Sequence, residues 1–361
     1  MRSNKVYEIQ KSPYAETDNP AGLNGFAFLE FAAPDPTVLF KDFTHLGFSK
    51  VAQHKDRDIT LWQQGEIQFV VNNDPQSHAK AFAKLHGPSV TAMGFRVKDQ
   101  NAAFKHVTKL GAEPFAKQEG PGLLDVPVIY GIGGSLIYFM DDLNWNLLNF
   151  KEFEKTSSAE NNDAGLKYLD HVTHNVFKGH MNAWADFYEH LFNFREIRYF
   201  DIQGKQTGLL SRAMTSPCHK IRIPLNESKD DKSQIQEYLD SYKGEGIQHI
   251  ALGAGNIYTS VETMRANKVQ FLEVPDTYYE MLDTRVPDHK EDKPRLQKNK
   301  ILVDGNPTKG QGLLLQLFTE NMLGPIFFEI IQRKGNEGFG EGNFQALFDA
   351  IERDQMKRGV L

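Results

Sequence analysis

Apolar and polar residues alternate along four separate stretches of the chain, and an amphipathic helical pattern follows each stretch. The alternation predicts half-buried strands at 25–33, 90–99, 168–177 and 246–256. The helical patterns lie at 35–48, 101–112, 181–194 and 256–271. Asp35 and Asn256 are suited to cap the starts of two of these helices, and Gly47 and Gly111 are suited to end two of them.

Short β-type runs follow each helix. The run 58–72, for example, alternates on both sides of a central turn. A strand, a helix and further strands therefore recur four times, and a repeat of this kind fixes which positions are equivalent. The pattern predicts an α+β protein of four βαβββ units, paired two and two.

Local composition sets the expected limits of these domains. Residues 1–20 are polar and mixed, and we expect a tail there. Residues 151–165 are charged, rich in Ser and Asn and poor in apolar residues, as linkers are. The expected domains are therefore 21–150 and 166–361. The charge run 288–300 is expected to be a solvated loop.

The overall composition narrows the classes of function. With 361 residues, 40% hydrophobic and 24% charged, the chain can form two sizeable cores. A net charge of −6 argues against nucleic acid as a partner, because binding a phosphate backbone needs an excess of Lys and Arg. A single cysteine, Cys218, excludes an intrachain disulfide. Neither a signal peptide nor a run of about 18 apolar residues occurs, so we expect a cytoplasmic protein without membrane contact.

Three polar residues stand at equivalent positions in the C-terminal pair of units. His171 and His249 lie in the first strands of units three and four, and Glu329 lies in an apolar last strand. The N-terminal half has Ala27, Met93 and Tyr138 at the positions we take as equivalent. A carboxylate among apolar residues needs a cation, and two imidazoles with one carboxylate form the open facial site of non-haem Fe(II) oxygenases. The sequence therefore predicts an iron site at these three residues.

Each of these residues also has an ordinary structural interpretation. A single strand histidine is commonly a hydrogen-bonded core or surface residue, and Glu329 could pair with Arg333 four residues later. The repeated placement favours the metal. His171 and His174 are three apart in a strand pattern and so point to opposite faces. We assign His171 as the ligand and His174 as a structural or supporting residue.

Several stretches together resemble one known family. They are "YLDHVTHNVF", "REIRYFDIQGKQTGLLSRAM", "IRIPLNES", "GEGIQHIAL", "PDTYYEML", "LLLQLFTE", "GPIFFEIIQRKG" and "GFGEGNF". From about residue 20 onward the chain resembles the bacterial 4-hydroxyphenylpyruvate dioxygenase family. The resemblance implies the vicinal-oxygen-chelate fold of glyoxalases and bleomycin-resistance proteins, in which the four units form two paired half-barrel domains. It also implies a metal-free N-terminal domain and Fe(II) bound by His171, His249 and Glu329.

The resemblance also implies a substrate pocket, with no catalytic residues beyond the metal ligands and those that orient the substrate. The implied pocket residues are Ser211, Asn226, Gln234, Gln248, Gln316, Phe318, Phe327, Phe339, Asn343 and Phe344. Phe327 and Phe344 are expected to sandwich an aromatic ring. The glycine-rich segment 338–344 is expected to be either a hinge that carries aromatic side chains or an ordinary turn. The amphipathic stretch 343–359 is expected to be a helix that covers the site or simply packs.

The implied activity is the conversion of 4-hydroxyphenylpyruvate and O₂ to homogentisate and CO₂, in tyrosine catabolism, by a homo-oligomer (a tetramer or a dimer). Three alternatives stay open. 4-Hydroxymandelate synthase uses the same substrate and metal. An extradiol ring-cleaving dioxygenase shares the fold, but the segment 338–344 argues against it. A metal-free binding module of this fold is disfavoured by the presence of all three ligands.

Overall fold

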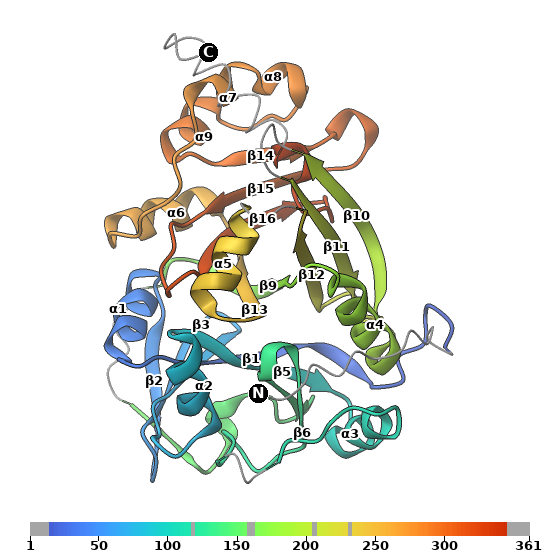
Figure 1. Cartoon of the computed structure of the whole chain (residues 1–361). Coiled ribbons are helices and arrows are strands. Elements are labelled where there is room, and N and C mark those ends of the chain that lie inside the picture. Colours follow the sequence, from blue (N-terminus) through green and yellow to red (C-terminus); the bar gives the residue numbers. More distant parts are fainter. Residues whose placement is uncertain (1–13, 117–119, 157–162, 204–207, 230–232, 345–361) are drawn as a thin grey trace.

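The computed structural model describes residues 14–116, 120–156, 163–203, 208–229 and 233–344. The chain forms two halves, and each contains one eight-stranded sheet. In Figure 1 the N-terminal half, blue to green, lies below the C-terminal half, green to red. No helix in these ranges is long and apolar enough to cross a membrane. The helix predicted at 343–359 falls almost entirely outside the described residues.

The N-terminal sheet has the strand order β6-β7-β5-β1-β4-β3-β2-β8. Its strands are β1 (Leu23–Ala32), β2 (Ser49–His54), β3 (Ile59–Gln64), β4 (Ile67–Asn72), β5 (Ser89–Val97), β6 (Val128–Tyr130), β7 (Leu136–Asp141) and β8 (Phe153–Lys155). The helices of this half are α1 (Thr37–His45), α2 (His78–His86) and α3 (Gln100–Lys109), with short 3-10 helices η2 (Ile132–Gly134) and η3 (Leu147–Asn149).

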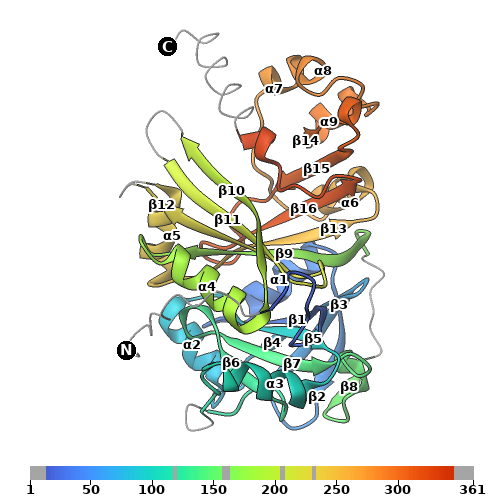
Figure 2. The ribbon, with the colours of Figure 1, turned by 90° about the vertical axis from the view of Figure 1, so that its right-hand side faces the viewer.

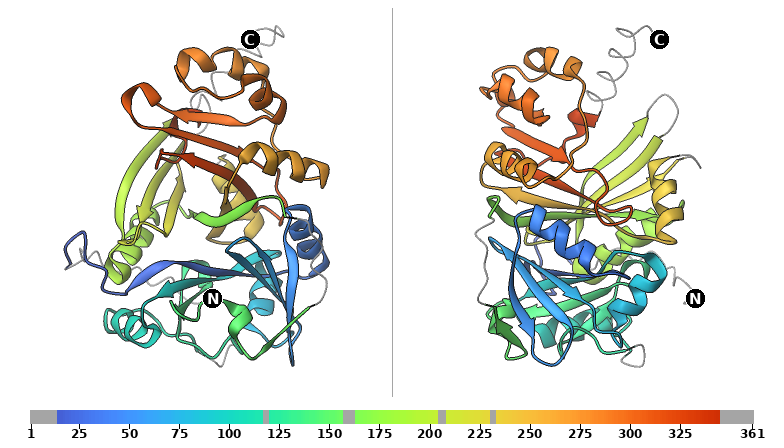
Figure 3. Two further views of the ribbon diagram at one scale, coloured as in Figure 1. Left: turned by 180° about the vertical axis from the view of Figure 1, so that it is seen from behind. Right: turned by 90° about the vertical axis from the view of Figure 1, so that its left-hand side faces the viewer.

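The C-terminal sheet has the order β10-β11-β12-β9-β13-β16-β15-β14. Its strands are β9 (Leu166–Val176), β10 (Arg195–Gln203), β11 (Gly208–Thr215), β12 (Arg222–Ser228), β13 (Gly246–Ala254), β14 (Leu302–Gly305), β15 (Leu313–Phe318) and β16 (Phe327–Lys334). Its helices are α4 (Met181–Phe192), α5 (Gln234–Tyr242), α6 (Ile257–Ala266), α7 (Asp276–Glu280), α8 (Leu282–Arg285) and α9 (Lys293–Asn299), with the 3-10 helix η4 (Pro307–Lys309). Figure 3 shows α7, α8 and α9 at the end remote from the N-terminal half.

Both sheets are built on one plan. The first strands of two units pair antiparallel at the centre, β1 with β5 and β9 with β13. Each of these strands pairs on its other side, in parallel, with the last strand of its own unit. This arrangement confirms the predicted α+β fold of paired units. The second unit is shorter than predicted, because an isolated bridge between Pro114 and Ile129 stands where a third returning strand would be.

The helix ends follow the sequence signals with one displacement. The Asn256 side chain accepts hydrogen bonds from the amides of Tyr258 and Thr259, which confirms it as the N-cap of α6. Gly47 and Gly111 follow α1 and α3 with φ of +93° and +98°, a conformation that glycine adopts without strain. Asp35 is not the cap of α1: the cap position is Pro36, although Asp35 accepts a hydrogen bond from the Thr37 amide at 2.9 Å.

The charge run at 288–300 is not wholly a solvated loop, and that prediction was wrong. Its second half forms α9, which is capped by the Asp292 side chain and anchored by the fully buried Leu296. Arg295 holds the helix against α6 through an ion pair with Glu262 at 2.7 Å. One buried leucine among charged neighbours gives too little hydrophobic periodicity to be recognised in the sequence.

The largest hydrophobic core lies between the two sheets. It includes Phe69 of β4 and Phe328 of β16, whose ring centroids are 6.2 Å apart across the two halves. Glu30 of β1 alternates with Leu29 and Phe31 of this core and so points to the opposite face of the sheet, where it is 1% exposed and accepts a hydrogen bond from Asn72 at 2.7 Å. Burial raises the pKa of Glu30 from 4.5 to about 7, although the bond from Asn72 favours the charged form.

This shift predicts a pH dependence of stability. The folded chain keeps a proton on Glu30 that the unfolded chain releases near pH 4.5, so the free energy of unfolding falls between about pH 4.5 and 7, by on the order of 3 kcal/mol. Glu30→Gln removes this loss, and its melting temperature should exceed that of the wild type by more at about pH 8 than at about pH 5. Glu154→Gln, at an exposed position, is the control. A difference that stays constant with pH would contradict the assignment.

Candidate metal centre

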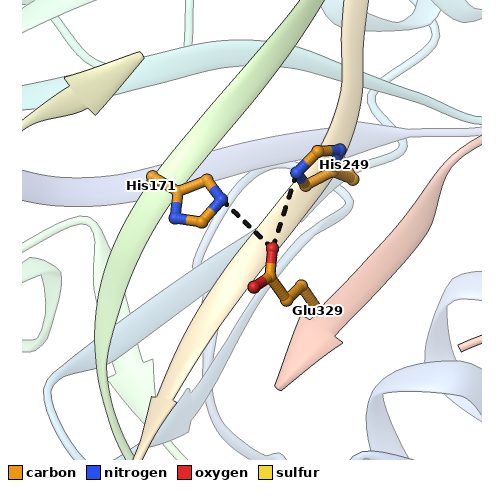
Figure 4. Close-up of side chains that lie close together, drawn as sticks. All are labelled: His171, His249 and Glu329. Carbon is orange, nitrogen blue, oxygen red and sulfur yellow. Dashed lines mark ion pairs between the residues drawn. The ribbon is translucent and has the colours of Figure 1, made fainter. Parts of the chain in front are cut away.

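His171, His249 and Glu329 meet inside the C-terminal half-barrel, where they extend from β9, β13 and β16 (Figure 4). The Glu329 Oε2 atom lies 3.2 Å from His171 Nε2 and 3.6 Å from His249 Nε2. One ligand atom from each residue lies within 4.8 Å of the other two. The strand register explains this convergence: His171 and Glu329 flank Ala251 of β13 on its two sides, and His249 lies two residues before it on the same face.

The same register corrects the counterparts assigned in the N-terminal half. They are Phe28, Ala92 and Tyr138. Ala27 and Met93 were each assigned one residue out of step. Ala27 falls at a register shift between β1 and β5, where Asp170 stands in the C-terminal half, and Met93 faces the core between the sheets. The true counterparts all belong to an apolar cluster in the N-terminal half-barrel, so neither an imidazole nor a carboxylate stands at any of these three positions.

A hydrogen-bond partner at Nδ1 holds each histidine ring in place. Nδ1 of His171 lies 2.9 Å from a carboxylate oxygen of Asp170, and Nδ1 of His249 lies 2.6 Å from the amide oxygen of Gln248. When Nδ1 donates its proton to these oxygens, the Nε2 atom of each neutral ring is an electron-pair donor toward the centre, although Nε2 of His249 also lies 2.9 Å from the Thr173 hydroxyl. Metal-binding histidines are fixed in this way by outer hydrogen-bond partners. The donor set therefore fits a divalent metal ion.

Asp170 is itself anchored by Arg333. Two hydrogen bonds of 2.8 Å join the Arg333 guanidinium to the two Asp170 oxygens, and the Asp170 side chain is fully buried. Burial alone would raise the pKa of Asp170, but the hydrogen bonds and charge of Arg333 hold that pKa well below its usual range. Arg333, which the sequence offered as a partner for Glu329, thus binds Asp170 instead. The sequence reasoning missed Asp170, although its place beside His171 is a usable signal.

Among the described residues, few positive charges lie near the carboxylate of Glu329. Burial alone would lower the pKa of His171, but the charges of Glu329 and Asp170 raise it above its ordinary value. Burial and the charge of His171 lower the pKa of His249 well below its ordinary value. His249 is therefore neutral, and among the three residues only His171 is favoured to carry a positive charge beside Glu329. A metal ion at the centre would replace the proton of His171 and serve all three ligands.

A chain of buried hydrogen bonds holds the other oxygen of Glu329. The Gln316 amide donates to Glu329 Oε1 at 3.3 Å, and the Asn343 amide donates to Gln316 at 3.0 Å. The Tyr278 hydroxyl donates to Asn343 at 2.6 Å. This chain links β16 and β15 to the glycine-rich segment 338–344, so one predicted pocket residue, Gln316, holds Glu329 directly and a second, Asn343, holds Gln316.

Aromatic rings surround the same centre. The Phe327 ring stacks on His249 with centroids 4.9 Å apart and an interplanar angle of 14°. Phe318 meets Phe327 edge to face at 6.0 Å, and Phe339 meets His171 edge to face at 5.4 Å. Three of the predicted aromatic residues therefore form an apolar wall beside the ligands.

The remaining predicted residues fall into two groups. Ser211 and Asn226 stand in register on β11 and β12, and the row continues to Asn175 on β9, on the face that carries His171. Gln234 is the exposed first residue of α5, and Phe344 is 38% exposed. Within the described ranges no hydrogen bond or ring contact joins either of these two to the triad.

Two further residues of β9, Asn175 and His174, point to opposite faces of the sheet. Asn175 is fully buried, and neither its amide nitrogen nor its amide oxygen has a partner among the described residues. The sequence reasoning missed it, because only the strand register places it beside Asn226. His174 faces the other side of the sheet, where its Nε2 lies 2.7 Å from the Tyr188 hydroxyl of α4. Burial lowers the pKa of His174 to about 3, so it is a neutral structural residue.

Removal of the carboxylate should abolish tight metal binding. We expect Glu329→Ala to weaken the affinity for a divalent ion by more than about 100-fold, because loss of a direct ligand exceeds the usual effect of losing an outer partner. Anaerobic titration calorimetry with Co(II) or Fe(II) measures this. Glu30→Gln, which changes an equally buried acid in the other half, should bind metal normally. Equal metal affinity in Glu329→Ala and the wild type would rule out this site.

Comparisons with known proteins agree with this geometry. The family model for the N-terminal domain of hydroxyphenylpyruvate dioxygenase matches residues 17–148, and that of the glyoxalase, bleomycin resistance protein and dioxygenase superfamily matches 168–290. A solved structure of a triple mutant of 4-hydroxymandelate synthase from Streptomyces coelicolor is 25% identical, with a TM-score of 0.78, over 92% of this chain and 99% of that one.

Two curated relatives match nearly from end to end. The 4-hydroxyphenylpyruvate dioxygenase of Legionella pneumophila (strain Corby) is 56% identical over 348 residues, which are 96% of this chain and 99% of the relative. The enzyme of the same name from Pseudomonas aeruginosa is 51% identical over 351 residues, 96% of this chain and 98% of the relative. The chain therefore belongs to the 4-hydroxyphenylpyruvate dioxygenase family.

Proposed function

We propose that this protein converts 4-hydroxyphenylpyruvate and O₂ to homogentisate and CO₂, with Fe(II) held by His171, His249 and Glu329. The observation that carries the proposal is the convergence of two Nε2 atoms on one carboxylate oxygen inside a buried half-barrel. Two imidazoles and one carboxylate on one face leave the opposite face of the metal open. Relatives of this name at 51% and 56% identity support the choice of substrate.

The ligand set suits an anionic substrate. When bound, Fe(II) supplies two-point chelation of an α-keto acid and activation of O₂. One carboxylate against a divalent ion leaves a net positive charge, which favours the carboxylate end of the keto acid. Asp170 and Gln248 keep both rings oriented, so the ligands need no rearrangement when the substrate arrives.

The aromatic and amide residues are proposed to orient the ring. Phe318, Phe327 and Phe339 form an apolar wall that excludes water from the open side of the metal. Gln316 and Asn343 hold Glu329 and border this space. Neutral amides can fix a bound substrate without adding a buried charge.

The phenol end is proposed to meet the row formed by Ser211 and Asn226, which provides uncharged hydrogen-bonding groups on the same face as His171. Gln248 belongs to the pocket through its contact with His249. Gln234 and Phe344 enter the proposal from the family resemblance alone. We further propose a cytoplasmic homo-oligomer, a dimer or a tetramer, in which the single cysteine stays reduced.

A second candidate function is that of 4-hydroxymandelate synthase, because this chain resembles a solved structure of that enzyme. The two reactions start from the same keto acid and differ in the carbon that is oxidised. The same metal ligands serve both, so only the product distinguishes them.

The identity of the product tests the proposal. After anaerobic reconstitution with Fe(II), the protein is given 4-hydroxyphenylpyruvate and then air, and the products are identified by chromatography and mass. We expect homogentisate with one CO₂ for each turnover, and no turnover by Glu329→Ala. 4-Hydroxymandelate would assign the second candidate. Bound iron without turnover of this keto acid would leave the metal site standing and refute the substrate.

The glycine-rich segment offers a test of the amide chain. Gly340 has φ of +78°, and a Cβ there would lie 1.6 Å from Gln316 Oε1. Gly340→Ala should displace Gln316 and Asn343 and reduce kcat/KM by about tenfold or more, as misplacement near a reacting centre does. Gly310→Ala is the matched control, because Gly310 has φ of +73° and open space around it. If the two variants lose equal activity, backbone strain and not Gln316 explains the effect.

A further inference from the structure

A pocket separate from the metal centre opens where the two halves meet. Its volume is about 610 Å³. The N-terminal half lines it with β1, the β3–β4 turn and Trp145, and the C-terminal half with the start of β9, the β11–β12 turn and the end of β16. None of the three metal ligands lines it. Figure 2 shows β9 as the strand of the upper half that lies nearest the lower half. Small ligands often bind at such domain junctions.

This interdomain pocket is cationic, although the whole chain has a net charge of −6. The basic side chains that line it are Arg96, Lys167, Lys220, Arg222 and Arg333. Only Glu66 and Glu337 are acidic. The Lys220 ammonium donates to the neutral side chain of Asn24 at 2.6 Å, and within the described ranges neither Lys167 nor Lys220 forms an ion pair. Two positive charges are therefore available to an anion.

Aromatic side chains line the same pocket. Phe26, Trp145 and Tyr168 all contribute, and Tyr168 is 37% exposed. The Arg96 guanidinium lies 4.3 Å from the centroid of the Trp145 ring and is held on its other side by Asp142 at 3.0 Å, so the Trp145 ring is backed by a fixed group. Flat apolar surfaces beside cations suit a small aromatic ring that bears a carboxylate. The volume falls within the usual range for small-molecule sites, about 300 to 1,000 Å³.

One carboxylate of the chain already occupies part of this pocket. Glu337 pairs with Arg222 at 2.5 Å, but its side chain is 69% exposed. An ion pair of this kind lies in water and is weak, so the carboxylate of a ligand can take its place. Glu337 belongs to the segment that continues to Phe339, whose ring packs on His171. Release of Glu337 would therefore remove one of the contacts that hold this segment beside the metal centre.

The wall of the pocket is also joined to a metal ligand. Arg333 binds Asp170 through two hydrogen bonds of 2.8 Å, and Arg222 approaches Asp170 to 3.7 Å. Asp170 in turn accepts the hydrogen bond from His171. Arg333 also donates to the backbone oxygen of Gly338 at 2.7 Å. A change of the carboxylate beside Arg222 can therefore reach His171 through Asp170, and the loss of Glu337 from Arg222 bears on the segment that Arg333 also holds.

We propose that the interdomain pocket is a second binding site, for a small aromatic carboxylate, and that its occupancy alters the metal centre through Arg222, Arg333 and Asp170. The carboxylate of the ligand replaces Glu337 between Arg222 and Lys220, and its ring lies against Trp145. The substrate and the product of the proposed reaction both belong to this chemical class, and in that respect the choice of ligand rests on the proposed function. The positive charge and the aromatic lining of the pocket do not depend on the proposed function.

A direct binding experiment tests the site. The full-length protein is titrated with 4-hydroxyphenylacetate, which has the ring and the carboxylate but no keto oxygen for two-point chelation. Calorimetry and tryptophan fluorescence report binding, and Trp145→Phe should remove the fluorescence change. We expect saturable binding that survives Glu329→Ala and weakens by about tenfold or more in Lys220→Ala. Lys290→Ala, at a lysine 82% exposed and outside the pocket, is the matched control and should bind normally.

A second measurement tests the coupling to the metal. The rate at which a chelator removes Fe(II) is compared with and without 4-hydroxyphenylacetate. We expect a change of about twofold or more in the wild type and none in Lys220→Ala. Absence of saturable binding, or binding that Glu329→Ala abolishes and Lys220→Ala leaves intact, would overturn the site. Binding with an unchanged release rate would overturn the coupling. Neither measurement requires turnover, so failure here is distinguishable from failure of the proposed reaction.

Discussion

The negative charge of Glu329 is the constraint on which the C-terminal half-barrel depends. Its side chain is 3% exposed, and a carboxylate so far removed from water is costly unless a cation lies beside it. His249 cannot supply that cation, because burial and the charge of His171 lower its pKa. A proton on His171 meets the need for one ligand only. A divalent ion meets it for all three, and because the ligands converge only in the folded chain, metal binding adds to the stability of this half.

The two halves share one fold, but the C-terminal half carries the candidate metal site and the N-terminal half supports it. Phe28 and Tyr138 fill the N-terminal half-barrel, and the Leu123 amide closes it with a hydrogen bond of 2.7 Å to the Tyr138 hydroxyl. In the C-terminal half, Phe328 and Glu329 are adjacent on β16 and point to opposite faces. Phe328 packs into the core between the halves, so the N-terminal half fixes the strand that presents Glu329 to the metal.

Period-two patterns predicted the central strands well, because each has one face toward a core and the other toward a half-barrel interior. The same logic identified the triad from repeat positions. It failed by one residue at both Ala27 and Met93, since irregularities in the pairing of β1 with β5 shift the register without a local signal in the sequence. Asp170 and Arg333 lie 163 residues apart in the sequence. Asn175 can be recognised as part of the site only because the neighbouring strand β12 lies beside it. Such long-range contacts depend on how the strands pair in the sheet, and a local sequence pattern does not specify that pairing.

The formal charges inside the site explain why a keto acid suits it. Glu329 and Asp170 each contribute one negative charge, Arg333 contributes one positive charge, and a divalent metal ion would contribute two, while Arg222 beside Asp170 is balanced by Glu337. The assembly is left with a single positive charge in a place shielded from water. A singly charged keto acid brings the total to zero, the state that costs least to bury. Asp170 matters to this balance as much as Glu329 does: without it, Arg333 would leave the occupied site positively charged even with substrate bound.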